Sequence, residues 1–382
     1  MKVVVAIDSF KGSMTSVEAG NTVAEGFKKA DSEVIVTVRP LADGGEGTVE
    51  ALTAGLHGKR EEVLVTGPLG EPVKSVYGIL EDSRTAIIEM SSAAGITLVE
   101  KDKLNPLDAT TKGVGEIIRD AINKGCRRFI VGIGGSATND GGAGMLQALG
   151  FDLLDKEGRQ IPCGAKGLKA LKKISDSNVI PELKECEFKI ACDVTNPLCG
   201  PNGCSAVFAP QKGASEDMIR DMDSWLSDYA RLSMQLNPQA DPDYPGCGAA
   251  GGMGFAFLSF TNATLQSGID LVIEETKLEE YIKESDLVVT GEGRLDFQTA
   301  MGKAPVGVAC LAKKYDKKVI AFAGSISEDA AECNKKGIDA FFAIVRGAVS
   351  LEEAMDKINA ENNLKLTAEQ VMRLIMSASK QL

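Results

Sequence analysis

Acidic and basic side chains follow predicted strands at several points of the chain, each time beside glycines. The apolar run 3–7 predicts a strand, and DSFKGS, which begins at Asp8, follows it directly. An aspartate in that place can hold a cation or orient a hydroxyl, and Lys11 can contact a phosphate or a carboxylate. After the second predicted strand comes ADGGEGT, in which Asp43 and Glu46 are suited to Mg²⁺. The glycines of this segment would let a ligand approach the backbone.

The longest glycine-rich segment, GIGGSATNDGGAG, spans residues 132–144 and precedes a predicted helix. Backbone N–H groups ahead of a helix can hold phosphate or another small anion, so we term this segment the anion loop. The residues expected to contact the anion are Gly134, Gly135, Ser136, Thr138 and Asn139. The segment also loosely matches the G-x-G-x-x-A dinucleotide pattern, although the helix begins late and residues 139–142 form an insertion.

Two later segments carry further charged side chains. In ACDVTNP, Asp193 follows an apolar strand and precedes a turn, so it is a candidate general base or metal ligand, with turn capping as the alternative. Nearby, APQKGA contributes Gln211 and Lys212. Residues 290–305, TGEGRLDFQTAMGKAP, have the richest mix of opposite charges after any predicted strand. The charged residues of this segment are Glu292, Arg294, Asp296 and Lys303.

Several catalytic classes are excluded because their motifs are absent from the sequence. There is no G-x-x-x-x-G-K-[ST] phosphate loop, no protein-kinase signature set and no G-x-S-x-G nucleophile turn. The single histidine, His57, is too little for a zinc site or a histidine-based triad. Acid–base chemistry therefore falls to Asp, Glu or Lys. Anion-binding loops, carboxylates for Mg²⁺ and cations for phosphates together favour phosphoryl transfer to a hydroxyl.

The elements that must position these residues alternate between strands and helices at both ends of the chain. Strand, glycine-rich turn and helix succeed one another over residues 1–56, and again from residue 286 onward. This pattern predicts an α/β fold with a mostly parallel, doubly wound sheet. Residues 63–90 hold β-rich runs without a helix, which predicts antiparallel hairpins and the start of a second domain. We therefore predict a discontinuous domain, residues 1–65 and 281–382, with a mixed α/β domain, residues 66–280, inserted.

Composition excludes other classes of protein. The 382 residues are 44% hydrophobic and 25% charged, which excludes a wholly disordered chain. The net charge of −12, without a basic stripe, argues against nucleic-acid binding. No apolar run reaches the roughly 18 residues of a membrane helix, and the start of the chain does not resemble a secretory signal. We expect a cytoplasmic protein without a membrane partner, whose nine cysteines are reduced thiols.

The order of these motifs resembles that of the bacterial glycerate kinase family, type one. The resemblance rests on DSFKGS, ADGGEGT, GIGGSATNDGGAG, DVTNPL, FAPQKGA, GAAGG and GEGRLDFQT with the following GK, which cover essentially the whole chain in register. It implies ATP-dependent phosphorylation of D-glycerate with Mg²⁺, usually at the 2-hydroxyl to give 2-phosphoglycerate and ADP. It also implies a flavodoxin-like domain built from both ends of the chain, with the second domain inserted between them.

The resemblance suggests a role for each candidate residue. Asp193 is our candidate for the base that orients the glycerate hydroxyl, with Asp296 as the alternative. The cations that would hold the substrate carboxylate and the γ-phosphate are Lys11, Arg294 and Lys303. The carboxylates assigned to Mg²⁺ are Asp43, Glu46 and Glu292. The anion loop, together with Lys303, is assigned to the nucleotide cofactor.

Other activities remain open at this point. A glycerate 3-kinase would give 3-phosphoglycerate, and a nicotinamide-dependent hydroxy-acid oxidoreductase would use residues 132–137 as a dinucleotide turn. A third alternative is a non-catalytic sensor that binds a small molecule. The sequence also leaves open which domain binds ATP and whether the protein is a monomer or a homodimer.

Overall fold

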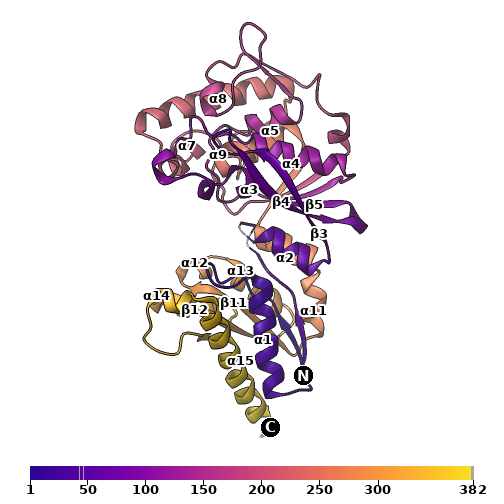
Figure 1. The fold of residues 1–382 in the computed structure, drawn as a ribbon, viewed down its shortest axis with the longest axis vertical. Coiled ribbons are helices and arrows are strands. Elements are labelled where there is room, and N and C mark those ends of the chain that lie inside the picture. The colour runs from indigo at the N-terminus through magenta and orange to yellow at the C-terminus, as the bar shows by residue number, and fades with distance from the viewer. Residues whose placement is uncertain (43, 46, 380–382) are drawn as a thin grey trace. The chain divides into compact units, whose positions relative to one another are not determined.

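The computed structural model describes residues 1–42, 44, 45 and 47–379. The chain divides into two compact units (Figure 1). The terminal unit consists of Met1–Asp43, Glu50–His57 and Ile269–Leu382, and the middle unit of Gly44–Val49 and Gly58–Gly268. The terminal unit is thus built from both ends of the chain. The domain boundaries proposed from the sequence, near residues 65 and 281, stay a prediction.

The terminal unit contains a parallel sheet with the strand order β13-β12-β11-β1-β2. Its strands are β1 (Lys2–Val5), β2 (Ile35–Val38), β11 (Leu287–Leu295), β12 (Lys318–Ile326) and β13 (Ala340–Ala343). β1 pairs with β2 on one side and with β11 on the other, so Val4 lies opposite both Thr37 and Val288. This is the strand order of a flavodoxin-like doubly wound sheet, and the predicted α/β fold class is confirmed.

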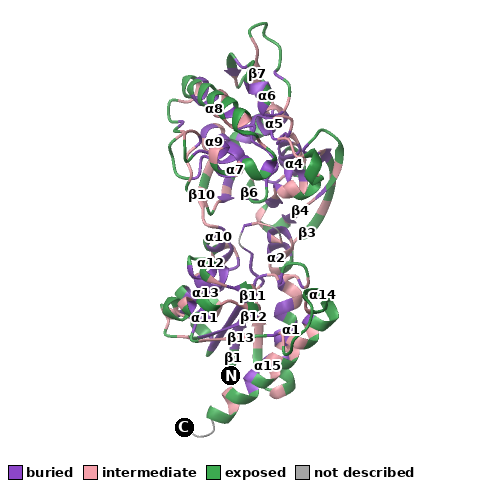
Figure 2. Ribbon diagram, turned by 90° about the vertical axis from the view of Figure 1, so that its left-hand side faces the viewer, coloured by how far each residue is buried: buried purple, intermediate pink, exposed green. Residues whose placement is uncertain are grey.

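Helices cover both faces of this sheet. They include α1 (Ser16–Ala30), α11 (Leu278–Glu284), α12 (Phe297–Ala300), α13 (Ala304–Lys313), α14 (Leu351–Met355) and α15 (Lys357–Ser379). α1 and α15 lie side by side (Figures 1 and 2). Val23, Phe27 and Leu364 from these helices pack with Val3 and Val5 of β1 in one core cluster. α11 contacts β1, and α13 contacts β11 and β12. Figure 2 shows these two helices on the face of the sheet opposite to α1 and α15.

The middle unit contains a mixed sheet with the strand order β10-β9-β6-β5-β4-β3. Its strands are β3 (Lys59–Thr66), β4 (Pro72–Leu80), β5 (Thr85–Glu89), β6 (Arg128–Gly132), β9 (Glu187–Ala191) and β10 (Asn262–Gln266). β3, β4 and β5 pair antiparallel, which confirms the hairpins predicted for residues 63–90. β5, β6, β9 and β10 pair in parallel, so their carboxyl ends lie at one edge of the sheet. β7 (Asp152–Leu154) and β8 (Lys173–Ser175) form a separate antiparallel pair.

The helices of the middle unit pack around a centre of aromatic side chains. They include α3 (Ser91–Ala94), α4 (Lys112–Asn123), α5 (Ala143–Ala148), α6 (Ala165–Leu168), α7 (Cys204–Phe208), α8 (Glu216–Leu236) and α9 (Ala249–Phe260). The rings of Phe129 and Phe188 stack with their centroids 4.7 Å apart, and the ring of Phe257 lies 5.6 Å from that of Phe188. α2 (Thr48–Gly55) and α10 (Gly268–Glu275) begin in this unit and continue into the terminal unit.

A kink in α9 brings the GAAGG motif against the anion loop. Gly251 has a φ of +69°, and a Cβ at this position would lie 2.1 Å from the backbone oxygen of Thr138. Only glycine permits so close an approach in this conformation. The contact is completed by Gly141 N, which donates a hydrogen bond to Gly251 O at 2.9 Å. Among the described residues, no helix has the length and apolar character that a membrane span requires.

Candidate active site

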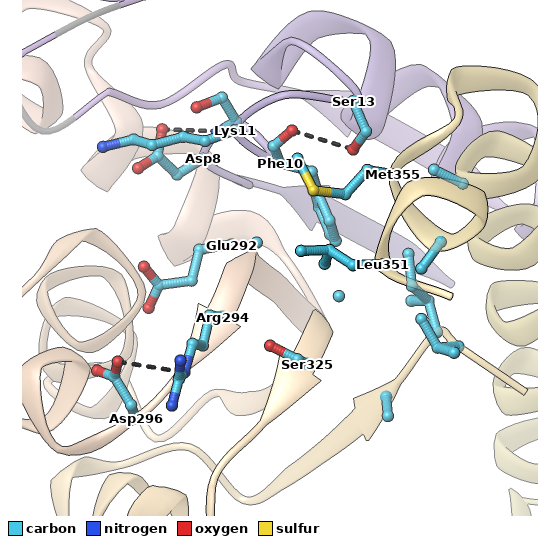
Figure 3. Close-up of a pocket in the computed structure, with 18 of the residues that line it drawn as sticks. Asp8, Phe10, Lys11, Ser13, Glu292, Arg294, Asp296, Ser325, Leu351 and Met355 are labelled. Atoms are coloured by element: carbon cyan, nitrogen blue, oxygen red, sulfur yellow. Dashed lines mark hydrogen bonds and ion pairs between the residues drawn. The ribbon is translucent and has the colours of Figure 1, made fainter. Parts of the chain in front are cut away.

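The carboxyl ends of β1 and β11 border a cavity of about 730 Å³ in the terminal unit (Figure 3). We term it the charged pocket because acidic and basic side chains line it. These side chains are Asp8, Lys11, Glu292, Arg294, Asp296 and Lys303. β1 pairs with β2 on one side and with β11 on the other, so the strand order reverses at this edge of the sheet. Ligands of doubly wound sheets bind outside the strand ends at such a reversal.

Two carboxylates of the charged pocket are nearly buried. Asp8 keeps 6% of its surface exposed, and its Oδ1 accepts a hydrogen bond from Ser9 N at 2.6 Å. Glu292 keeps 8% exposed and accepts a hydrogen bond from the hydroxyl of Thr299. Buried carboxylates are stable only when cations or hydrogen-bond donors surround them. Both side chains are therefore suited to hold a cation that arrives with a ligand.

The third carboxylate of the charged pocket, Asp296, caps the short helix α12. Its Oδ1 accepts hydrogen bonds from Gln298 N at 2.9 Å and from Thr299 N at 3.3 Å. Its Oδ2 lies 3.7 Å from Nε of Arg294. Figure 3 marks this ion pair with a dashed line. Lys303 Nζ donates to Oε1 of Gln298 at 3.0 Å. The cap and the ion pair occupy both oxygens of Asp296, which favours a role in positioning Arg294.

The anion loop lies between β6 and α5 in the middle unit. Gly134 and Gly135 are exposed, whereas Ser136 keeps 7% of its surface exposed. Ile96 N donates a hydrogen bond to Gly135 O at 2.8 Å, which holds the exposed part of the loop to the segment after α3. The structure thus presents the glycines to solvent, as an anion-binding loop requires.

A buried lysine supports the anion loop. Lys212 is 1% exposed, and its Nζ donates hydrogen bonds to Ser136 Oγ at 2.8 Å and to Thr138 O at 2.6 Å. Burial lowers the pKa of Lys212 to about 8, and Cys204 and Asp140 act in the opposite direction. The sequence indicated Lys212 only as a neighbour of the Asp193 segment. Its contact with Ser136 spans 76 residues of chain, and only the fold brings the two together.

Two further residues that the sequence placed on the anion loop, Thr138 and Asn139, are fully buried beneath it. Nδ2 of Asn139 donates to Oγ of Ser205 at 2.8 Å, so this side chain braces the loop from below. Asp140 is also buried and accepts hydrogen bonds from Thr111 N at 2.9 Å and Gly142 N at 3.1 Å. Burial raises the pKa of Asp140, although these hydrogen bonds oppose the shift. Direct contact of Thr138 and Asn139 with an anion stays a prediction.

Asp193 follows β9 at the edge of the middle unit's sheet where the parallel strands end. It is exposed, and its Oδ1 accepts a hydrogen bond from Gly268 N at 2.9 Å. β9 is the neighbour of β6, which precedes the anion loop. Gly44 packs closely on this edge, because a Cβ there would lie 2.5 Å from that of Ala191. The candidate base and the anion loop thus follow neighbouring parallel strands.

Glu89 is a further carboxylate at the same edge, and the sequence did not single it out. It ends β5, and its Oε1 accepts a hydrogen bond from Val49 N at 2.7 Å, in the first turn of α2. A carboxylate at a helix start is favoured by the helix dipole. Asp43 and Glu46, which were predicted to bind Mg²⁺, lie outside the described residues. Within the described ranges, no group of three or more His, Cys, Asp or Glu side chains is arranged for a metal ion.

Comparisons with known proteins agree over almost the whole chain. Residues 3–376 match the sequence profile of the Glycerate kinase family. A glycerate kinase of Bacillus subtilis is 47% identical over 99% of this chain and 98% of its own length. A glycerate 2-kinase of Escherichia coli is 48% identical over 93% of each chain. A crystal structure named as a glycerate kinase 2 of Salmonella typhimurium LT2 superposes with a TM-score of 0.92 and 44% identity, covering 100% of both chains.

Proposed function

The chain belongs to the glycerate kinase family, and from this premise we propose that it transfers the terminal phosphoryl group of ATP to the 2-hydroxyl of D-glycerate. The products are 2-phosphoglycerate and ADP. The name of the Escherichia coli relative, a glycerate 2-kinase at 48% identity, supports the choice of hydroxyl. The observation that carries the reaction type is the charged pocket, because phosphoryl transfer depends on charged groups held around the phosphates.

The cations of the charged pocket are suited to the phosphate chain. Lys11 is exposed, and the side chain of Arg294 is 67% exposed, so both can reach a ligand. Arg294 offers a planar set of donors to phosphate oxygens, whereas Lys11 and Lys303 act as point charges. Their charge would offset the negative charge that spreads over the transferred group in the transition state.

Mg²⁺ fits the donor set of the charged pocket. Asp8 and Glu292 supply carboxylate oxygens, which are hard ligands, and protein sites for Mg²⁺ commonly use one or two carboxylates with the substrate phosphates. We assign Glu292 and Asp8 to the ion, with Asp43 and Glu46 as the further carboxylates expected from the sequence. When bound, Mg²⁺ would neutralise charge on the phosphate oxygens.

Asp193 is the proposed base for the glycerate hydroxyl. The hydrogen bond from Gly268 N holds one carboxylate oxygen, and exposure leaves the side chain accessible to a substrate. A carboxylate in this role accepts the proton as the hydroxyl oxygen attacks phosphorus. Asp296 is the alternative, although the α12 cap and Arg294 already engage its oxygens.

The anion loop would hold a second anionic group, either the glycerate carboxylate or part of the phosphate chain. Because Lys212 Nζ donates to Ser136 Oγ, the hydroxyl proton of Ser136 is directed away from the ammonium and can be donated to a ligand. The exposed backbone of Gly134 and Gly135 would supply further contacts. Thr138 and Asn139 would keep the loop in shape from below.

We also propose that the two compact units correspond to the two domains expected from the sequence, and that the protein acts in the cytoplasm. All nine cysteines lie in the described residues and are free thiols, which is typical of a reducing compartment.

A coupled assay tests the proposed function. Purified protein is incubated with D-glycerate, ATP and Mg²⁺, and product is passed to enolase with or without phosphoglycerate mutase. We expect ADP release and phosphoenolpyruvate with enolase alone. Phosphoenolpyruvate that forms only after mutase is added would show a 3-kinase, and absence of ADP release would remove D-glycerate as the substrate. A titration of reduced nicotinamide cofactor, followed by absorbance, tests the oxidoreductase alternative in the same samples.

A further inference from the structure

One wall of the charged pocket is apolar, and phosphate chemistry does not explain it. Phe10 and Ile344 form the buried part of this wall, each with 2% of its surface exposed. Val349, Leu351 and Met355 form the open part and are 43%, 75% and 38% exposed. Large apolar side chains that remain exposed within a cavity indicate a ligand or partner that covers them.

The apolar wall and the charged groups lie on different sides of the same cavity. Figure 3 shows Phe10, Leu351 and Met355 on one side, and the charged ends of Lys11 and Glu292 on the other. D-glycerate has a carboxylate and two hydroxyls on three carbons, so it offers no surface that an apolar wall can recognise. A ligand that contacts both sides needs a polyanionic part and a flat apolar part. A nucleoside triphosphate has both.

We propose that the charged pocket of the terminal unit is the nucleotide site, with the adenine ring against Val349, Leu351 and Met355 and the phosphates toward Lys11 and Arg294. This inference rests on the proposed function, because it assigns the phosphoryl donor of that reaction to one unit. The cavity of about 730 Å³ lies within the range of about 300–1,000 Å³ that is usual for small-molecule sites. It also lies at the reversal of strand order, where doubly wound sheets bind nucleotides.

The local structure ties the apolar wall to the loop that carries Lys11. Gly12 has a φ of +84°, and a Cβ there would lie 2.4 Å from Cε of Met355. The glycine therefore permits both the turn and the packing of Met355 against it. Ser350 Oγ accepts a hydrogen bond from Glu353 N at 3.1 Å, which caps α14 and fixes the helix that presents Leu351. The same loop thus positions the contacts for the phosphates and for the adenine ring.

The test separates the contact with the adenine ring from the contacts with the phosphates. The variant Leu351→Ser/Met355→Ser removes the open part of the wall without adding charge, and Leu374→Ser on α15, where Leu374 is 63% exposed, is the matched control. Affinities for ADP and for inorganic tripolyphosphate, both with Mg²⁺, are measured by calorimetry. We expect the double variant to bind ADP about tenfold more weakly, with tripolyphosphate affinity and the KM for D-glycerate unchanged within about twofold. The control should match the wild type.

Other results would overturn the nucleotide site. If the double variant bound ADP as tightly as the wild type, the adenine ring would not contact this wall. Equal losses for ADP and tripolyphosphate would mean that the substitutions deform the phosphate contacts. The outcome is independent of the substrate assignment: if the double variant loses ADP affinity as expected but the wild type fails to phosphorylate D-glycerate, the proposed function fails and the nucleotide site stands. If the wild type forms 2-phosphoglycerate while the double variant keeps its ADP affinity, the proposed function stands and the nucleotide site fails.

Discussion

The charged pocket and the anion loop offer an anion two different environments. In the charged pocket, cations are presented on flexible side chains in contact with solvent, and Arg294 keeps 67% of its side chain exposed. Beneath the anion loop, Lys212 is 1% exposed and donates a hydrogen bond to the hydroxyl of Ser136, which keeps 7% of its surface exposed. Solvent screens the exposed cations, whereas the buried ammonium acts through a medium of low polarity.

This difference determines whether a substitution should change turnover, unfolding or both. Exposed ion pairs contribute about 0–1 kcal/mol to stability, so changes to the exposed cations of the charged pocket should alter ligand binding or turnover and leave unfolding nearly unchanged. A buried, hydrogen-bonded charge is part of the folded core, so changes at Lys212 should alter both. Activity and unfolding measured together on each variant therefore distinguish the two regions.

The largest effect on turnover is expected at Asp193, the proposed general base. This variant tests which region activates the glycerate hydroxyl. Asp193→Asn should lower kcat by about 10²-fold or more, because the amide cannot accept the proton. The hydrogen bond from Gly268 N can be kept by the amide oxygen, so the fold should be retained. Steady-state kinetics with D-glycerate and ATP provide the measurement.

The control for Asp193→Asn is Asp228→Asn, which changes an exposed aspartate on α8 that pairs with Arg231. It should show wild-type turnover. Near-wild-type kcat in Asp193→Asn would remove Asp193 as the base and transfer the role to the charged pocket. An unchanged melting temperature in both variants is needed to assign the loss to chemistry.

The second effect is a pH dependence of stability that comes from Lys212. Its pKa is lowered to about 8 in the folded protein, so the protonated amine destabilises the fold fully below that pH. The penalty is relieved as pH rises from about 8 toward the unfolded value near 10.4, because the folded state releases the proton first. Between pH 7 and 9.5 this group should add about 2 kcal/mol to the free energy of unfolding.

Other groups titrate in this range, so the comparison must be made against Lys212→Met. Cys204, which faces Lys212, has its pKa raised to about 11 by burial, and such thiols weaken the fold as pH rises past the unfolded pKa. Burial raises the pKa of Asp140, the other charged neighbour, and this carboxyl is present in both proteins. Urea unfolding of wild type and variant at both pH values isolates the contribution of Lys212. Parallel stability curves would contradict a buried, protonated lysine.

The third effect is expected at Arg294, where activity and stability should separate. Arg294→Ala should lower kcat/KM for ATP roughly tenfold, since Lys11 and Lys303 retain part of the positive charge. The free energy of unfolding should change by less than about 0.5 kcal/mol, because the side chain of Arg294 is 67% exposed and its pair with Asp296 is 3.7 Å long. Arg220→Ala, which removes another exposed arginine, is the control for both measurements. A stability loss of about 1 kcal/mol or more in Arg294→Ala would contradict the expected separation of activity and stability in the charged pocket.

The sequence predicts the fold more fully than it predicts the site. Continuous apolar runs after the chain start and near residue 287 indicate strands buried on both faces, and these strands pair in parallel as β1 and β11. The charged residues after these strands could be grouped because strand ends share an edge of the sheet. Lys212 could not be assigned, since local pattern does not show that a lysine is 1% exposed and contacts Ser136, 76 residues earlier. The apolar wall of α14 was missed for the same reason: Leu351 and Met355 follow a helical pattern that core packing also produces.

The smallest effect is expected at Asp296, and it sharpens the contrast with Asp193 because the same substitution is made in the other region. Asp296→Asn should lower kcat less than about threefold, because asparagine also caps a helix and only the 3.7 Å pair with Arg294 is weakened. Asp296→Ala, which removes the cap as well, should reduce the free energy of unfolding by about 1 kcal/mol. Kinetics of the Asn variant and urea unfolding of the Ala variant provide the two readouts. If Asp296→Asn instead lost turnover as severely as is expected for Asp193→Asn, the base would lie in the charged pocket, and the cap would be a means of orienting it.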